Sequence, residues 1–219
     1  MLADVNGVKL FYTMSGAGKP LLLLHGNSQN HKIFDKISRK LKERFTLYAL
    51  DSRNHGESGK NDDISYEAMT EDVHAFVNEL GIAPVNLIGF SDGAIIGAML
   101  AMKHPGDAEK MALLGPNLSP EDLTEEFVLW LKGIMEKHPS RLLDMILEEP
   151  HIDPEDLKKI TCPTLVVFGD DDIVSPEKAR EISRAIPGSE FLEMKGHGHE
   201  SHIVDNDLMA ETFIEFFER

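Results

Sequence analysis

Short apolar runs alternate with longer amphipathic stretches along this chain. The runs predict strands at Val8–Met14, Leu21–Leu24, Phe45–Leu50, Val85–Ile88, Met111–Leu114, Thr164–Phe168 and Phe191–Met194. After the first, which belongs to a hairpin-like segment, the runs are continuous rather than alternating. Continuous runs are typical of parallel strands that helices cover on both faces.

Helical spacing fills the intervals between the runs. One predicted helix carries Met69, Val73, Phe76, Val77 and Leu80 on one face and stops at Gly81, and an earlier one carries Ile33, Ile37 and Leu41. Three later helix starts combine a capping side chain, a proline and an acid, at Ser119-Pro120-Glu121, Asp153-Pro154-Glu155 and Ser175-Pro176-Glu177. Strands alternating with helices predict an α/β fold with a mostly parallel central sheet and helices on both faces.

Length and composition narrow the class of protein. The 219 residues favour a single domain over residues 1–219. A net charge of −16 argues against nucleic acid or an anionic membrane as the main partner. No apolar run approaches the ~20 residues of a membrane helix, and no secretory signal is visible at the N-terminus. The single cysteine, Cys162, fits a reducing compartment, so we expect a cytoplasmic protein.

In parallel α/β sheets the chemistry gathers at the carboxyl ends of the strands. The run Val85–Ile88 is followed by Gly89-Phe90-Ser91-Asp92-Gly93, which matches G-x-S-x-G between a strand and a helix. Such a turn is so tight that it needs small flanking residues, and it exposes the serine hydroxyl as a nucleophile. After Leu21–Leu24 comes His25-Gly26-Asn27, where the Asn27 N–H is a candidate oxyanion donor.

Two further strand ends supply an acid and a base. Gly169-Asp170-Asp171-Asp172 follows Thr164–Phe168, and Lys195-Gly196-His197-Gly198-His199 follows Phe191–Met194. A carboxylate in the segment after Phe168 can orient a histidine in the segment after Met194, and that histidine can act as a general base. Ser91, Asp172 and His199 thus occur in the order nucleophile, acid, base, each just past its own strand.

With these motifs the chain resembles the α/β-hydrolase superfamily over nearly its whole length. The resemblance includes the loop Asp51-Ser52-Arg53-Asn54-His55-Gly56-Glu57-Ser58, which looks like a structural D-x-R-x-x-G-x-S loop and in which we interpret Arg53 and His55 as stabilising. It implies Asp172 as the acid and His199 as the base. It also implies that the backbone N–H groups of Asn27 and Asp92 form the oxyanion hole.

Two departures from the family pattern concern the substrate pocket. Most members have an uncharged residue after the nucleophile, whereas this chain has Asp92, whose carboxylate we expect to point away from the oxyanion hole. The segment inserted between the strands ending near Leu114 and starting near Thr164 is short, and we expect a small helical lid at about 120–161. Its apolar stripe, with Phe127 and Trp130 as candidate substrate contacts, either packs on the sheet or roofs an acyl pocket.

The function predicted from these residues is a serine hydrolase acting on a small carboxylic ester or related acyl bond through an acyl-enzyme. We expect a small-molecule acyl substrate and no cofactor or metal. Lactonase, carbon–carbon bond hydrolase and aminopeptidase activities remain alternatives with the same triad, as does a non-catalytic binding role. A metal hydrolase built on His197, His199 and His202 with Asp170 to Asp172 is a further alternative, but it leaves the serine turn without a role.

Overall fold

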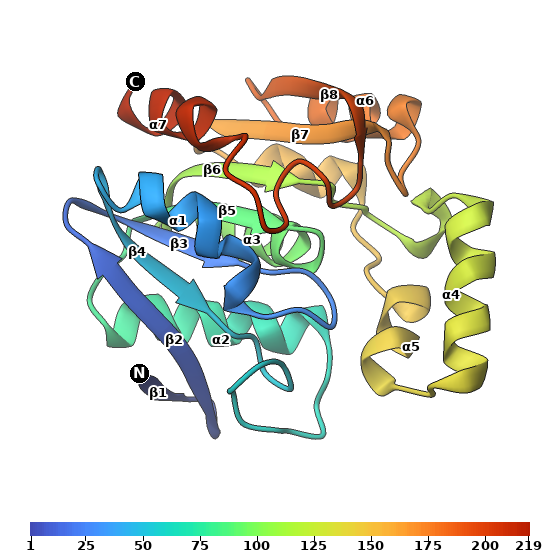
Figure 1. The fold of residues 1–219 in the computed structure, drawn as a ribbon, viewed down its shortest axis with the longest axis horizontal. Coiled ribbons are helices and arrows are strands. Elements are labelled where there is room, and N and C mark those ends of the chain that lie inside the picture. The colour runs from blue at the N-terminus through green and yellow to red at the C-terminus, as the bar shows by residue number, and fades with distance from the viewer.

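An eight-stranded sheet forms the centre of the computed structural model, which describes residues 1–219 (Figure 1). The strands lie in the order β1-β2-β4-β3-β5-β6-β7-β8. Their bounds are β1 Leu2–Val5, β2 Val8–Gly16, β3 Lys19–Leu24, β4 Phe45–Leu50, β5 Val85–Phe90, β6 Ala108–Leu114, β7 Thr164–Asp171 and β8 Glu190–Gly198. Only the pairs β1–β2 and β2–β4 are antiparallel, so the predicted mostly parallel α/β sheet is confirmed.

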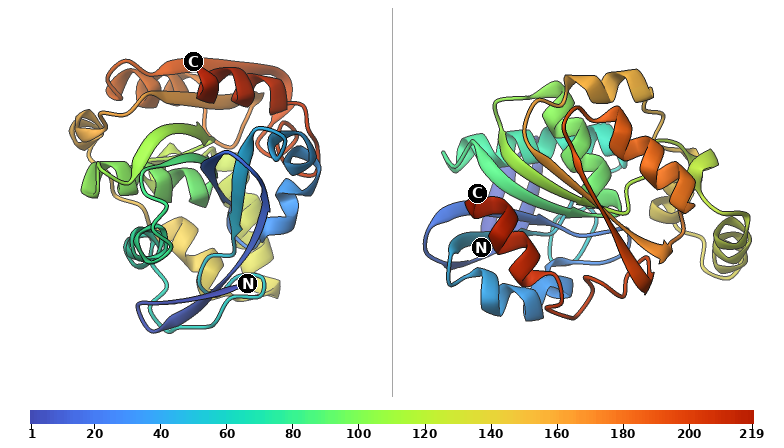
Figure 2. Two further views of the ribbon diagram at one scale, coloured as in Figure 1. Left: turned by 90° about the vertical axis from the view of Figure 1, so that its left-hand side faces the viewer. Right: turned by 90° about the horizontal axis from the view of Figure 1, so that it is seen from above.

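Helices cover both faces of the sheet (Figure 2). The helices α2 (Tyr66–Glu79), α3 (Asp92–Lys103) and α6 (Pro176–Ala185) contribute to a core cluster of 35 buried residues on one face. On the other face, α1 (Asp35–Leu41), which follows the 3₁₀ turn η1 (His31–Phe34), and α7 (Ala210–Glu218) contribute to a second cluster of 20. Burial on both faces is what the continuous apolar runs predict.

Residues 120–148 lie beyond the carboxyl ends of the strands (Figure 1). They contain η2 (Pro120–Asp122), α4 (Glu125–Lys137) and α5 (Arg141–Glu148). The following turn η3 (Pro154–Lys159), which belongs to the segment expected to form the lid, packs instead against α3 and α6 with Leu157 in the core. Of the three predicted helix starts, two therefore open 3₁₀ turns, and only Ser175 caps an α-helix. No helix of the fold combines the length and the apolar character needed to cross a membrane.

Candidate active site

Parallel strands end at one edge of the sheet, and five residues with chemical or steric roles are each the first residue past a strand. They are His25 after β3, Ser91 after β5, Gly115 after β6, Asp172 after β7 and His199 after β8. Because β3, β5, β6, β7 and β8 are consecutive parallel neighbours, their ends lie side by side. The sheet topology therefore brings together residues that lie far apart in the sequence.

Ser91 occupies a strained turn between β5 and α3. Its φ is 53°, in the left-handed region that non-glycine residues rarely adopt. The flanking glycines are needed because a β-carbon on Gly89 would overlap the carbonyl of Gly93, and one on Gly93 would overlap the carbonyl of Leu24. The Ser91 N–H donates to the Leu114 carbonyl at 2.8 Å, which fixes the turn to the end of β6.

His199 and Asp172 lie side by side because β7 and β8 are paired as far as the two residues that precede them. Asp171 lies opposite Gly198, after a register shift between Gly169 and Asp171 that extends β7 beyond its predicted end. The His199 Nδ1 and Asp172 Oδ1 atoms are 2.6 Å apart. This arrangement lets the carboxylate fix the orientation and the tautomer of the imidazole.

The Asp172 side chain is fully buried but well satisfied. Its oxygens accept from the N–H groups of Gly169 at 3.1 Å and Ile173 at 2.8 Å, in addition to His199. Burial raises the pKa of Asp172, but the hydrogen bond and charge of His199 and the two backbone donors outweigh it, so the pKa lies below the usual range for aspartate. Asp172 is therefore held as a carboxylate.

The other ring nitrogen of His199 is free to act on a substrate. Its Nε2 is buried and makes no hydrogen bond within the protein. The ring packs against Phe90, with 4.9 Å between the ring centroids. His199 and Ser91 line the same cavity, of about 330 Å³. A hydrogen bond between nucleophile and base often tightens only once substrate is bound.

The apolar stripe of α4 faces this cavity. Phe127, Trp130, Leu131 and Ile134 line it together with Leu143 and Ile146 of α5. Trp130 is still 59% exposed, so the cavity opens to solvent beside it. The stripe therefore lines the cavity, and its first member, Phe127, also packs against the core cluster.

The two predicted oxyanion donors flank the nucleophile. Neither the Asn27 nor the Asp92 backbone N–H donates a hydrogen bond within the protein. The Asp92 side chain turns away to Tyr66, whose hydroxyl donates to Oδ1 at 2.8 Å, and to Asn27, whose Nδ2 donates to Oδ2 at 3.0 Å. Burial is the main cause that raises the pKa values of both Asp92 and Tyr66.

Sequence reasoning missed Tyr66 and Gly115. Tyr66 opens α2 and belongs to no recognised motif, and only the structure shows its hydroxyl reaching the residue after the nucleophile. In the sequence, the stretch from Gly115 to Asn117 stands out only for its lack of a carboxylate, although Asn117 also lines the cavity. No periodicity or motif signals that the Tyr66 hydroxyl contacts Asp92, or that the ring of His199 lies against Gly115.

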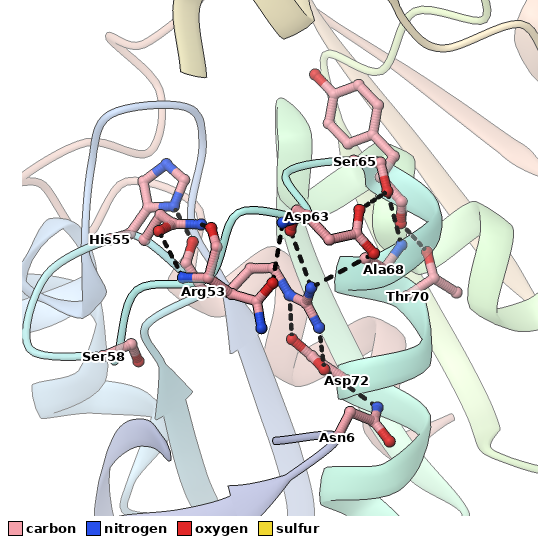
Figure 3. A network of polar contacts seen from close by, with 12 residues as sticks. Asn6, Arg53, His55, Ser58, Asp63, Ser65, Ala68, Thr70 and Asp72 are labelled. Atoms are coloured by element: carbon pink, nitrogen blue, oxygen red, sulfur yellow. Dashed lines mark hydrogen bonds and ion pairs between the residues drawn. The ribbon is translucent and has the colours of Figure 1, made fainter. Parts of the chain in front are cut away.

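Residues of the loop from Asp51 to Ser58 take part in a network of polar contacts (Figure 3). The Arg53 guanidinium forms a two-point contact with Asp72, with Nε to Oδ2 and the second nitrogen to Oδ1 both at 2.7 Å. His55 accepts from the Ser28 N–H at 3.0 Å and contacts the Arg53 carbonyl at 2.9 Å through Nδ1. Neither Arg53 nor His55 lines the cavity.

The histidines of the metal alternative have separate partners. His197 contacts the Ser201 hydroxyl, His199 contacts Asp172, and His202 contacts the Gly198 carbonyl. No group of three or more His, Cys, Asp or Glu side chains lies close enough to hold a metal ion.

Comparison with known proteins supports the fold. A family model described as "alpha/beta hydrolase fold" matches residues 19–137. The chain is 30% identical to Lipase 1 of Psychrobacter immobilis, covering 98% of this chain and 82% of that protein. It is 26% identical to the AB hydrolase superfamily protein YisY of Bacillus subtilis (strain 168), with 95% of each covered.

Among solved structures, the enol-lactonase from Burkholderia xenovorans LB400 superimposes with a TM-score of 0.81 at 24% identity, with all of both chains covered. The chain thus belongs to the alpha/beta hydrolase fold family, and the class of protein that its fold and relatives define is a hydrolase.

Proposed function

We propose that this protein is a serine hydrolase that cleaves small carboxylic esters or related acyl bonds. The observation that carries the proposal is the state of His199. One ring nitrogen contacts the buried Asp172 at 2.6 Å, and the other is buried without a partner in the cavity that Ser91 lines. This is the arrangement a general base needs beside a hydroxyl nucleophile.

The reaction follows from these positions. The Ser91 hydroxyl attacks the carbonyl carbon of the substrate while His199 Nε2 accepts its proton. The negative charge that forms on the carbonyl oxygen is stabilised by the N–H groups of Asn27 and Asp92. His199 then protonates the leaving group, and in the second half-reaction it activates the water that releases the acid from Ser91.

The cavity supports a small substrate. Its volume of about 330 Å³ is at the lower end of the range for ligand pockets, and ten of its 19 lining residues are hydrophobic. The lid proposed at about 120–161 contributes only two α-helices to the roof. A short acyl group or a small leaving alcohol fits such a space better than a long chain.

A panel of p-nitrophenyl esters of increasing acyl length tests the proposal. Release of p-nitrophenol by the wild-type protein, with a preference for short acyl groups and no release by Ser91→Ala, is expected. Lactones and amino-acid amides belong in the panel, because structural neighbours include an enol-lactonase and an N-acyl homoserine lactone degrading enzyme. Absence of hydrolysis across the panel would count against the proposed reaction.

A further inference from the structure

Five aspartates of this protein are buried: Asp51, Asp72, Asp92, Asp107 and Asp172. Four of them have a basic side chain within ion-pair distance. The pairs are His31–Asp51 at 2.8 Å, Arg53–Asp72 at 2.7 Å, His74–Asp107 at 2.6 Å and His199–Asp172 at 2.6 Å. Asp92 has no such pair, although it is only 5% exposed. A buried carboxylate is costly unless it is paired, so this exception calls for a physical reason.

Asp92 also differs from the other four in its position. It lines the cavity beside Ser91, and the four paired aspartates do not. Its two hydrogen-bond partners, Tyr66 and Asn27, are neutral. Each carboxylate oxygen can accept more than one hydrogen bond, so each keeps capacity for a further donor.

The rest of the cavity supplies no permanent positive charge that could serve as the missing partner, since its one basic side chain, His199, is paired with Asp172. Its lining contains a second carboxylate, Glu200, and no lysine or arginine. The whole chain carries a net charge of −16, which adds to the negative potential around the opening. The cavity therefore disfavours a substrate that carries a carboxylate near the reacting bond.

We propose that the substrate itself supplies the counter-ion, and that this protein prefers esters or related acyl compounds with an ammonium group close to the scissile carbonyl. Asp92 is then the residue that determines this preference, since a desolvated charge pair beside the nucleophile favours the cationic substrate over a neutral substrate of equal size. The inference rests on the proposed hydrolase function for its kinetic test, but its binding test is independent of turnover.

The kinetic test compares three phenyl esters of nearly equal shape. They are the esters of alanine, isobutyric acid and methylmalonic acid, in which the same position is an ammonium, a methyl or a carboxylate group. For the wild-type protein we expect kcat/KM to fall in that order. The ammonium group also activates the carbonyl chemically, so the decisive quantity is the alanine-to-isobutyrate ratio of kcat/KM in each variant relative to wild type.

Asp92→Asn removes the charge and keeps the shape of the side chain. This change should reduce the alanine-to-isobutyrate ratio by roughly 10- to 100-fold, the range of a charge-assisted hydrogen bond. Tyr66→Phe is the matched control, because it removes one hydrogen bond to Asp92 and keeps the carboxyl group itself. It should keep the ratio within about threefold of wild type. Equal losses in both variants would mean that the network matters rather than the charge, and would overturn the inference.

A binding measurement separates this inference from the proposed reaction. Trp130 is the only tryptophan in the chain and lines the cavity, so its fluorescence reports ligand entry. In Ser91→Ala protein, alaninamide should bind at least about tenfold more tightly than isobutyramide, and Asp92→Asn in that background should remove the difference. Tighter binding of alaninamide without any hydrolysis by wild type would support the cation site and refute the proposed reaction. Hydrolysis of all three esters with equal binding of the two amides would support the proposed reaction and refute the cation site.

Discussion

The imidazole of His199 lies in the space that a side chain at position 115 would fill. A β-carbon on Gly115 would lie 2.6 Å from Cε1 and 2.8 Å from Nδ1 of His199. Gly115 is the first residue past β6, the strand between those that lead to Ser91 and Asp172. The absence of a side chain there is what allows the ring to sit over the end of the sheet, in contact with Asp172.

Replacing Gly115 by alanine should therefore displace the ring of His199 and lower turnover by at least about tenfold, because misplaced catalytic groups lose rate steeply. The residue also has a φ of +62°, so the variant should lose stability. Gly188→Ala is the matched control, since Gly188 has a φ of +70° and no atom within 4 Å of the point that a β-carbon would occupy. Ester kinetics and thermal unfolding of both variants separate the two effects. Equal turnover in the two variants would contradict the steric role of Gly115.

The three neighbouring histidines should respond differently to replacement by alanine. His199→Ala should lose at least about 10³-fold in turnover, as expected for a triad member. His197→Ala should retain most turnover, because its ring hydrogen-bonds to the Ser201 hydroxyl and does not line the cavity. His202→Ala should also retain most turnover but should lower the unfolding temperature, since that ring is fully buried. A dead His202→Ala protein together with an active His199→Ala protein would refute the assignment of the base.

The three consecutive aspartates at 170–172 should also respond differently to replacement, here by asparagine. Asp172→Asn should lower kcat by roughly 10²–10⁴-fold with little change in substrate affinity, because the carboxylate orients and stabilises the imidazolium. Asp170→Asn and Asp171→Asn should cost less than about tenfold. Asp170 accepts from the Gly196 N–H at 2.8 Å, and Asp171 is exposed. Kinetics of the three variants on one ester decide the assignment, and a large loss at Asp171 with none at Asp172 would overturn it.

The pH dependence of folding should reveal a buried histidine outside the triad. Burial, together with the nearby His55, lowers the pKa of His25 to about 4, whereas an unfolded chain has a histidine pKa of about 6.5. The unfolded state therefore binds more protons between these values, and stability present above pH 6.5 is lost as the pH falls towards 4. The contribution to the slope approaches about 1.4 kcal/mol per pH unit.

Urea unfolding at several pH values measures that slope. His25→Gln should flatten it, and His138→Gln, at an exposed position, should leave it unchanged. An identical slope in His25→Gln and in the wild-type protein would show that another group accounts for the loss.

Much of the fold could be predicted from the sequence because buried parallel strands are continuous apolar runs. Phe45–Leu50 was predicted with its observed bounds, and the other predicted strands extend by a few residues, mostly into polar or glycine positions. The short strand β1 was missed as a separate element, since it is an antiparallel edge strand in which buried and exposed residues alternate. β8 extends furthest beyond its predicted bounds, because it stays paired with β7 as far as Asp171 and Gly198, past the register shift near Gly169.

The site was predictable only where a motif sits at a strand end. Ser91, Asp172 and His199 satisfy that condition, and the topology brings their strands together. The contacts of Asp92 were not predictable, since Tyr66 and Asn27 reach it from 26 and 65 residues away. What the apolar stripe of α4 faces could not be predicted either, because an apolar helix face does not indicate whether a sheet or a cavity lies opposite it.

Labelling with a fluorophosphonate probe tests the central claim most directly. The probe reacts with a serine only when a neighbouring base activates the hydroxyl, and peptide mapping by mass spectrometry locates the adduct. We predict a single adduct on Ser91, strongly reduced labelling in His199→Ala, and none in Ser91→Ala protein that remains folded. An adduct at another residue with Ser91 unmodified, or undiminished ester hydrolysis by folded Ser91→Ala, would contradict the account.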